Sequence, residues 1–246
     1  MSRSNFYNRF HKVTGLQSSF IEAENFTYRN LIKILEKYIN NKKPVLDIGC
    51  GVGTIDYFLA KRGYDIEGID ISEQAINICK KNSEILGLKD NIKFKRINFP
   101  KEKIRGKYDL IICNEVLEHL KEDKEAVKAI FNLLYSKGIA VFSVPSKNAP
   151  LYKMGFADEF DRKVGHLRRY LAKELEDLLK KENFEIKETI RTEGLLRNFL
   201  FLNPLFRSLI KILNRIRLLS DLVTFLDNFT IYLFGESDIF VIAQKP

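Results

Sequence analysis

The most constraining feature of this sequence is a regular alternation of short apolar runs with amphipathic helical segments between residues 44 and 190. The apolar runs predict strands over residues 45–48, 65–70, 92–97, 108–113, 139–144 and 184–190. Helical periodicity predicts helices over residues 19–41, 54–61, 72–86, 122–134 and 171–181. Strands that alternate with helices form βαβ units and a mostly parallel sheet covered by helices on both faces. We therefore predict a doubly wound α/β fold.

Composition and charge narrow the class of protein further. The length of 246 residues suits one ordered domain. The formal net charge of +9 favours an anionic partner such as RNA or a membrane surface, and the alternative is that the basic residues only face solvent. Cys50, Cys79 and Cys113 form no CxxC pair, which favours free thiols in a reducing compartment. Because we find no signal peptide and no apolar run long enough for a transmembrane helix, we predict a cytoplasmic protein.

A glycine-rich loop follows the first predicted strand. Gly49, Gly51 and Gly53 allow backbone angles that other residues avoid, and they let a ligand approach the main chain closely. The dinucleotide-binding pattern requires a sixth-position glycine where this chain has Thr54, and a P-loop requires a lysine that is absent here. Asp47 opens the loop instead, and an acid at a strand end suits a cation better than a pyrophosphate.

Asp70 ends the second predicted strand, at the distance from the loop at which a carboxylate accepts both hydroxyls of a ribose. The alternative is that Asp70 merely precedes Ser72, which is expected to cap the next helix. The glycine loop upstream favours the ribose role.

Four segments resemble, in order, the motifs of class I S-adenosylmethionine-dependent methyltransferases. They are the glycine loop at residues 45–53, the second strand end at 68–72, the fourth strand with the segment after it at 108–120, and a turn and fifth strand at 136–145. The resemblance covers residues 42–190 and implies a Rossmann-like, seven-stranded sheet. Its last two strands, an antiparallel pair, correspond to residues 184–190 and 239–243. The resemblance is specific for fold and cofactor, and it does not identify the methyl acceptor.

This resemblance implies a binding site for S-adenosylmethionine. The implied residues are Asp47, Gly49, Cys50, Gly51, Gly53, Asp70, Ile71, Asn98, Phe99 and Asn114. Asp47 and Gly49 are expected at the methionine end, and Asp70 and Ile71 at the ribose and adenine. Asn98 stands where the family commonly has Asp. Asn114 either contacts the methionine part or belongs to a strand-end turn.

A possible metal site follows the fourth strand. Glu115, Glu118 and His119 have the spacing i, i+3 and i+4, which puts them on one face if the segment is helical. Two carboxylates, an imidazole and the later His166 form a plausible set of ligands for a divalent metal. The arrangement resembles the metal sites of small-RNA 2′-O-methyltransferases and ubiquinone-biosynthesis O-methyltransferases. The alternative is that these side chains only fix the loop by hydrogen bonds.

We interpret residues 145–170 as a long acceptor-binding loop, because loops of this length after a strand are usually functional. Within it, residues 165–170 resemble a segment of methyltransferases that act on sugars, lipids and other small molecules. His166, with His119 as a second candidate, is the expected catalytic base if no metal is used, although a histidine here can also simply bond the backbone.

A segment rich in Leu, Phe and Ile at residues 194–235 separates the last two strands. It carries Arg197, Arg207, Lys211, Arg215 and Arg217 against Asp221 and Asp227. Positions 207, 211 and 215 have helical spacing, and Leu209, Leu213 and Ile216 lie opposite them. Three interpretations stay open: a cap over the acceptor pocket, core or homodimer packing, and peripheral contact with a membrane.

We predict one methyltransferase domain in four parts: a helical N-terminal cap (1–43), a cofactor-binding core (44–193), an apolar helical insertion (194–235) and the last strand (236–246). Phe6, Tyr7, Phe10 and His11 are expected to form one wall of the site. The predicted reaction is methyl transfer to an oxygen of a small-molecule or lipid acceptor. The alternatives are an RNA 2′-O-methyltransferase, a nucleotide-dependent oxidoreductase and a non-catalytic cofactor-binding protein.

Overall fold

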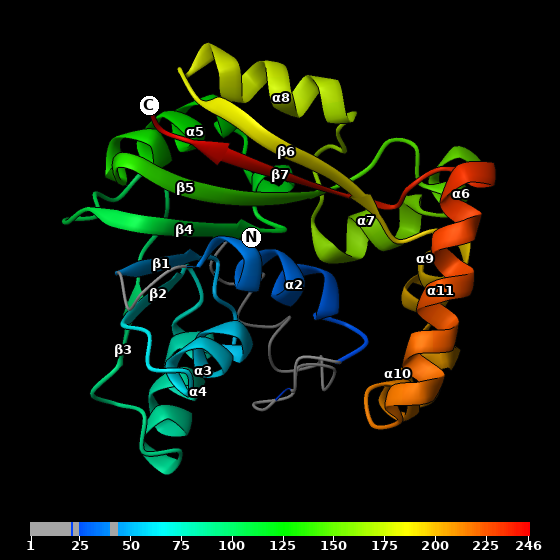
Figure 1. Cartoon of the computed structure of the whole chain (residues 1–246), viewed down its shortest axis with the longest axis horizontal. Helices are drawn as coiled ribbons and strands as arrows, with labels where there is room; N and C mark the ends of the chain where they lie inside the picture. The colour runs from blue at the N-terminus through cyan, green and yellow to red at the C-terminus, as the bar shows by residue number, and fades with distance from the viewer. Residues whose placement is uncertain (1–20, 22–24, 40–43) are drawn as a thin grey trace.

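The computed structural model describes residues 21, 25–39 and 44–246 and is built around a seven-stranded sheet (Figure 1). The strands are β1 (Val45–Ile48), β2 (Ile66–Asp70), β3 (Ile92–Arg96), β4 (Tyr108–Asn114), β5 (Leu134–Pro145), β6 (Glu185–Thr192) and β7 (Asp238–Gln244). Their order is β3-β2-β1-β4-β5-β7-β6, in which the first five are parallel and β7 runs antiparallel to both β5 and β6. The predicted doubly wound, mostly parallel seven-stranded fold is confirmed.

Helices cover both faces of the sheet (Figure 1). One face carries α2 (Arg29–Tyr38), α3 (Thr54–Ala60) and α4 (Glu73–Ile85), and the other carries α5 (Asp123–Leu133) and α8 (Ala172–Lys181). Each layer buries its own apolar cluster against the sheet, with Ile55 and Ile76 in the first and Val127 and Leu175 in the second. The sheet is therefore buried on both faces, as a mostly parallel sheet requires.

Local sequence signals fix the ends of several helices. The Ser72 hydroxyl accepts a hydrogen bond from the Ala75 N–H at 3.1 Å and so caps α4, as predicted. Gly87 follows that helix with a φ of 66°, a left-handed conformation that favours glycine.

The helix predicted over residues 19–41 is shorter where the structure describes it. Its observed part, α2, begins at Arg29, because the Asn25 side chain accepts the N–H groups of Thr27 and Tyr28 at 3.0 and 3.1 Å and holds residues 26–28 in a turn. Phe6, Tyr7, Phe10 and His11 lie outside the described residues.

Two further predictions need correction. β5 begins at Leu134 rather than at residue 139, and the predicted turn at 136–138 is an irregularity within the strand, with Lys137 at a φ of 65°. The long loop after β5 contains two short helices, α6 (Pro150–Lys153) and α7 (Asp158–Val164). Pro150 starts α6, and Gly165, at a φ of 87°, ends α7.

The segment between β6 and β7 is helical and lies at one end of the sheet (Figure 1). It contains α9 (Leu195–Leu202), the 3₁₀ turn η2 (Pro204–Phe206), α10 (Arg207–Leu213) and α11 (Arg217–Phe234). α10 ends at Leu213, so Arg215 lies in the turn that follows the helix rather than within it.

α11 packs with its polar side inward. The Arg29 guanidinium donates hydrogen bonds to the hydroxyls of Ser220 and Thr224 at 2.9 and 2.8 Å. The buried Asp227 carboxylate accepts the N–H groups of Gly194 and Arg197, both at 2.9 Å, and so caps the start of α9. These polar contacts determine which side of α11 faces the protein.

The three cysteines are free thiols, with Cys79 and Cys113 buried and Cys50 partly exposed. Among the helices that the structure describes, none combines the length and the apolar composition that crossing a bilayer requires.

The capping role of Asp227 predicts a specific loss of stability. Asp227→Ala leaves two buried backbone N–H groups without acceptors, and we expect it to lower the free energy of unfolding by about 2–4 kcal/mol. Urea denaturation checks this value. Asn228→Ala, on the exposed side of the same helix, is the matched control and should change stability by less than about 0.5 kcal/mol. Equal losses in the two variants would contradict the capping role.

Candidate functional site

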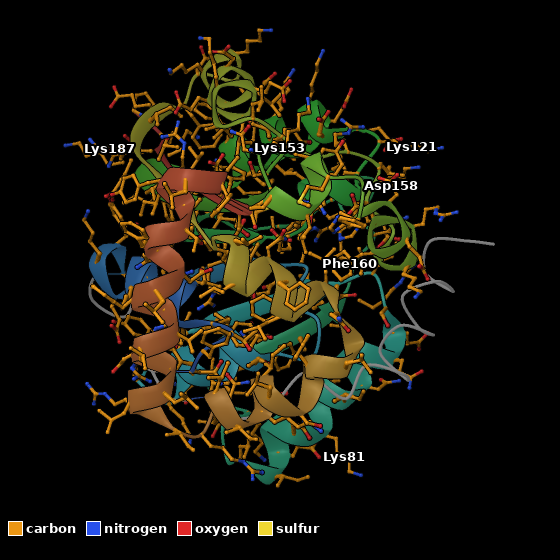
Figure 2. All side chains as sticks on the ribbon, turned by 90° about the vertical axis from the view of Figure 1, so that its right-hand side faces the viewer. Lys81, Lys121, Lys153, Asp158, Phe160 and Lys187 are labelled. Atoms are coloured by element: carbon orange, nitrogen blue, oxygen red, sulfur yellow. The ribbon has the colours of Figure 1, made fainter. Side chains whose placement is uncertain are left out.

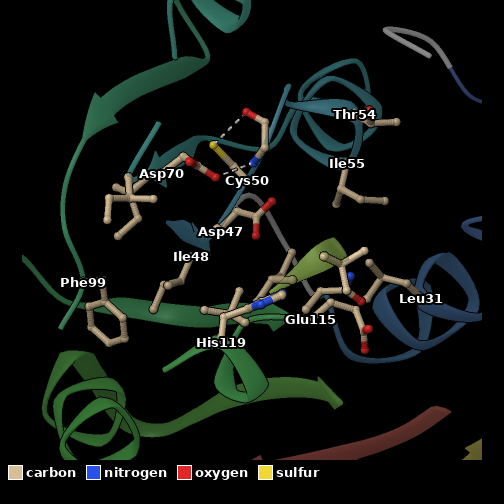
Figure 3. Close-up of a pocket in the computed structure, with 18 of the residues that line it drawn as sticks. Leu31, Asp47, Ile48, Cys50, Thr54, Ile55, Asp70, Phe99, Glu115 and His119 are labelled. Carbon is tan, nitrogen blue, oxygen red and sulfur yellow. Dashed lines mark hydrogen bonds between the residues drawn. The ribbon is translucent and has the colours of Figure 1, made fainter. Parts of the chain in front are cut away.

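The parallel strands end around a cavity of about 360 Å³ (Figure 3). It lies where β1 has β2 on one side and β4 on the other, the point at which a doubly wound sheet binds its ligands. Its lining includes the predicted residues Asp47, Gly49, Cys50, Gly51, Asp70, Ile71, Phe99, Asn114, Glu115, His119 and His166. Tyr28, Leu31, Thr54, Ile55, Phe160 and Val164 also line it.

The glycine loop depends on backbone angles that favour glycine. Gly49 has a φ of 77°, and a Cβ atom placed on it would lie 2.5 Å from Cγ2 of Val116, so the loop can approach the segment after β4 only with glycine here. Gly53 is not among the described lining residues. It is the N-cap of α3, where a Cβ would lie 3.0 Å from the rings of both Tyr57 and Phe94.

Asp47 lies at the end of β1 and is 6% exposed. Burial, and the neighbouring charge of Asp70, raise the pKa of Asp47 to about 7. A cation bound beside this carboxylate would stabilise its ionised form. The site therefore favours a positively charged group at the end of β1.

The Asp70 carboxylate joins the loop to the following helix. Its oxygens accept the Gly51 N–H at 3.1 Å and the Ser72 N–H at 2.7 Å, so the residue fixes the glycine loop and also precedes the helix cap. These bonds hold the carboxylate at the edge of the cavity (Figure 3). Ile71, the next residue, also lines the cavity.

The other expected cofactor residues divide into two groups. Phe99 and Asn114 line the cavity, and the Asn114 side-chain oxygen accepts a hydrogen bond from the Ser143 hydroxyl at 3.0 Å. Asn98 is not among the described lining residues. Its backbone N–H bonds Glu102 at 3.1 Å, because the chain turns at residues 98–102 after β3.

Glu115 does not share a helical face with Glu118 and His119. It follows β4 in a left-handed conformation with a φ of 55°, and only residues 117–119 form a 3₁₀ turn, η1 (Leu117–His119). The predicted helical i, i+3, i+4 arrangement is wrong, because the strand continues to Asn114 and the chain turns sharply at Glu115. Glu115 still lines the cavity, where its carboxylate accepts a hydrogen bond from Ser143 at 3.3 Å.

Glu118, His119 and His166 converge although two different segments supply them. One potential ligand atom from each lies within 4.8 Å of the other two. Glu118 is fully buried, and neither of its carboxylate oxygens has a hydrogen-bond partner. The Nε2 atoms of His119 and His166 lie 3.5 and 3.8 Å from its Oε1. Burial, and next the charge of Glu115, raise the pKa of Glu118 well above its ordinary value.

Both imidazoles are oriented through their other ring nitrogen. Nδ1 of His119 lies 3.0 Å from the Gly165 carbonyl, which can only accept, so Nδ1 carries the proton of the neutral ring. Nδ1 of His166 lies 3.0 Å from Oδ1 of Asp161. Although burial raises the pKa of Asp161, hydrogen bonds from His166 and Arg169 hold it at about 2, so it stays ionised. The Nε2 atoms of both rings lie near the Glu118 carboxyl group.

Sequence reasoning missed Asp161 and the apolar wall. Asp161 lies in α7, five residues before His166, and Gly165 ends that helix between them. The signal in the sequence would have been this helix end, which brings Asp161 back to His166. Tyr28 and Leu31 come from the N-terminal part of the chain, which therefore does contribute to the cavity wall.

Residues 195–235 contribute no described side chain to the lining of this cavity. Tyr28, Leu31, Phe160 and Val164, which lie outside this segment, are among the apolar residues of the wall. The interpretation of the insertion as a cap over the pocket is thus not supported, because its helices pack beside the sheet and against α6.

Comparison with known proteins independently indicates the family of this chain. Residues 21–189 match the model of a family described as a methyltransferase domain. The ubiquinone biosynthesis O-methyltransferase of Psychrobacter cryohalolentis is 28% identical over 158 residues, which are 61% of this chain and 60% of that protein. The enzyme of the same name from Coxiella burnetii is 34% identical over 122 residues, 49% of this chain and 52% of its own length. This chain thus spans 60% or less of these relatives.

A solved structure shows the same fold. Phosphoethanolamine N-methyltransferase 2 of Haemonchus contortus, in complex with S-adenosyl-L-methionine, superposes with a TM-score of 0.69 at 16% identity, over 100% of this chain and 60% of that one.

The ion pairs of Asp161 predict a pH-dependent stability. Because its pKa is lowered to about 2, ionised Asp161 stabilises the fold above its unfolded pKa, near 3.9, and this contribution is lost as the pH falls through about 2. We expect Asp161→Asn to cost about 2 kcal/mol at pH 7 in urea denaturation and almost nothing at pH 2. Asp158→Asn, on the exposed side of α7, is the control. A loss that persists at pH 2 would contradict this assignment.

Proposed function

This chain belongs to the class I S-adenosylmethionine-dependent methyltransferases, and from that membership we propose that it transfers a methyl group from S-adenosylmethionine to an oxygen of a small-molecule or lipid acceptor. The observation that carries the proposal is that one cavity contains both a pair of carboxylates and a pair of imidazoles. Asp47 and Asp70 lie beside the glycine loop, and the imidazoles of His119 and His166 lie across from it.

The residues beside the glycine loop fit S-adenosylmethionine. The buried Asp47, whose pKa is raised, suits the ammonium group of the cofactor, and the Asp70 carboxylate suits its ribose hydroxyls. Ile71 and Phe99 provide apolar surface for the adenine ring. When bound, the cofactor supplies an electrophilic methyl group, so the protein mainly aligns donor and acceptor and excludes water.

Glu118, His119 and His166 fit a divalent metal. An orphaned buried carboxylate next to two oriented Nε2 atoms is the donor set that zinc, manganese or iron accepts, and hydrogen bonds from Nδ1 are typical of metal-bound histidines. A metal here would lower the pKa of an acceptor hydroxyl. Glu115 belongs to the four-residue set predicted from the sequence, but it lies outside the group whose ligand atoms converge, so we assign it to the acceptor side.

His166 also supports deprotonation of the acceptor without a metal. Ionised Asp161 holds the proton on its Nδ1, so Nε2 is free to remove a proton from an acceptor hydroxyl, and His119 is the second candidate. The acceptor oxygen then forms the bond to the methyl carbon as the carbon–sulfur bond breaks. The names of the relatives support an oxygen acceptor. The apolar wall of Leu31, Phe160 and Val164 favours a small or lipid molecule over RNA.

Cofactor binding should depend on pH through Asp47. Because its free pKa is about 7 and binding favours its ionised form, the affinity for S-adenosylmethionine should be full at pH 8 and about tenfold weaker at pH 6. Isothermal titration calorimetry measures this change. Asp47→Asn should bind weakly with no such dependence, whereas Asp65→Asn, at the opposite end of β2, should behave as the wild type. Binding of NAD in place of S-adenosylmethionine would overturn the cofactor assignment.

The metal proposal predicts a defined response to Mn²⁺. Electron paramagnetic resonance should show bound Mn²⁺ in the wild type, loss of binding in Glu118→Gln and His166→Asn, and binding about 10–100-fold weaker in Asp161→Asn. Glu115→Gln is the matched control and should bind Mn²⁺ within a few-fold of the wild type. Circular dichroism verifies that each variant is folded. If Glu118→Gln binds Mn²⁺ as well as the wild type does, the metal site is wrong and His166 acts alone.

A further inference from the structure

The outward side of α11 is a continuous apolar stripe. Leu218, Leu222, Phe225, Phe229 and Tyr232 are spaced by four and three residues, and their exposure ranges from 54% for Leu222 to 89% for Tyr232. Figure 2 turns this end of the molecule, with α11 running along it, toward the viewer. We name these five residues the α11 stripe. Large side chains exposed together in this way are unusual on a protein surface that meets only water.

The orientation of α11 is fixed by its other side. Arg29 bonds Ser220 and Thr224, the Asp227 carboxylate caps α9, and the Thr230 hydroxyl accepts the Leu195 N–H at 2.8 Å. Rotating the helix to bury the α11 stripe would break these bonds and expose buried polar groups. The apolar side therefore faces outward because the polar side is specifically bound.

The charge beside the α11 stripe is positive. Lys211, Arg215 and Arg217 are exposed where α10 leads into α11. Asp221 pairs with both Arg29 and Arg217, and Asp227 is buried, so the positive charge of this end comes from Lys211 and Arg215. The surface thus combines large apolar side chains with a basic end.

We propose that the α11 stripe and its basic end bind the surface of an anionic lipid bilayer. An interfacial helix of this kind places Phe and Leu side chains among the acyl chains and basic residues among the phosphates. Charge complementarity therefore favours an anionic bilayer over a second copy of this surface, which carries the same positive charge. The α11 stripe would lie in the plane of the bilayer while the polar side stays bound to the protein. This inference does not depend on methyl transfer.

Flotation with lipid vesicles tests the proposal on the full chain. The wild type should bind vesicles containing phosphatidylglycerol and bind pure phosphatidylcholine vesicles much less, with binding weakened by salt. Phe225→Ser/Phe229→Ser and Lys211→Gln/Arg215→Gln should each lower the partition coefficient by about tenfold or more. The matched controls are Ile85→Ser and Lys80→Gln/Lys81→Gln, which change exposed residues of the same kinds on α4 and should bind as the wild type does.

Three outcomes would overturn the proposal. One is a wild type that does not bind phosphatidylglycerol vesicles. Another is an equal loss of binding in the α4 controls. The third is a wild-type dimer, detected by light scattering, that Phe225→Ser/Phe229→Ser converts to a monomer, since a second copy would then cover the α11 stripe.

Discussion

The burial of acidic groups without cationic partners is the constraint on which this site depends. Asp47 is 6% exposed, Glu118 is fully buried, and burial raises the pKa of both carboxyl groups. A buried charge costs free energy unless another charge compensates it, so a chain retains such groups mainly where a ligand provides that compensation. Both carboxyl groups belong to segments that meet at the carboxyl end of the parallel strands. Both buried carboxyl groups, with the free-energy cost of their burial, thus lie at the edge of the sheet where doubly wound folds bind ligands.

The outer surface has the opposite electrostatic character. The whole chain has a net charge of +9, and basic residues lie at one end of the α11 stripe, whereas carboxylates line the cavity. This separation suits a cationic cofactor in the interior, and it is the basis of our proposal that the outer surface binds an anionic bilayer. Arg29, in α2, connects the N-terminal layer to α11 through buried hydrogen bonds.

The sequence predicted what local patterns determine. The glycine loop, Asp70 and the Ser72 cap were recognisable because each is marked by a short residue pattern at a strand end or a helix start. The helical placement of Glu115 failed because an i, i+3, i+4 spacing also occurs across a strand end and a 3₁₀ turn. The polar inner side of α11 was not predictable, because Arg29 lies 191 residues from Ser220 and only the folded chain brings them together. Asp161 was missed for a similar reason, since its role depends on where His166 and Arg169 fold around it.

The central claim is that the methyl donor and a divalent metal occupy the same cavity. Nuclear magnetic resonance of S-adenosylmethionine labelled with carbon-13 in its methyl group, with Mn²⁺ added to the full chain, tests it most directly. Our account predicts strong broadening of the methyl resonance by Mn²⁺, no broadening by diamagnetic Zn²⁺, and loss of the effect in Glu118→Gln. A methyl resonance from bound cofactor that Mn²⁺ leaves sharp would contradict it.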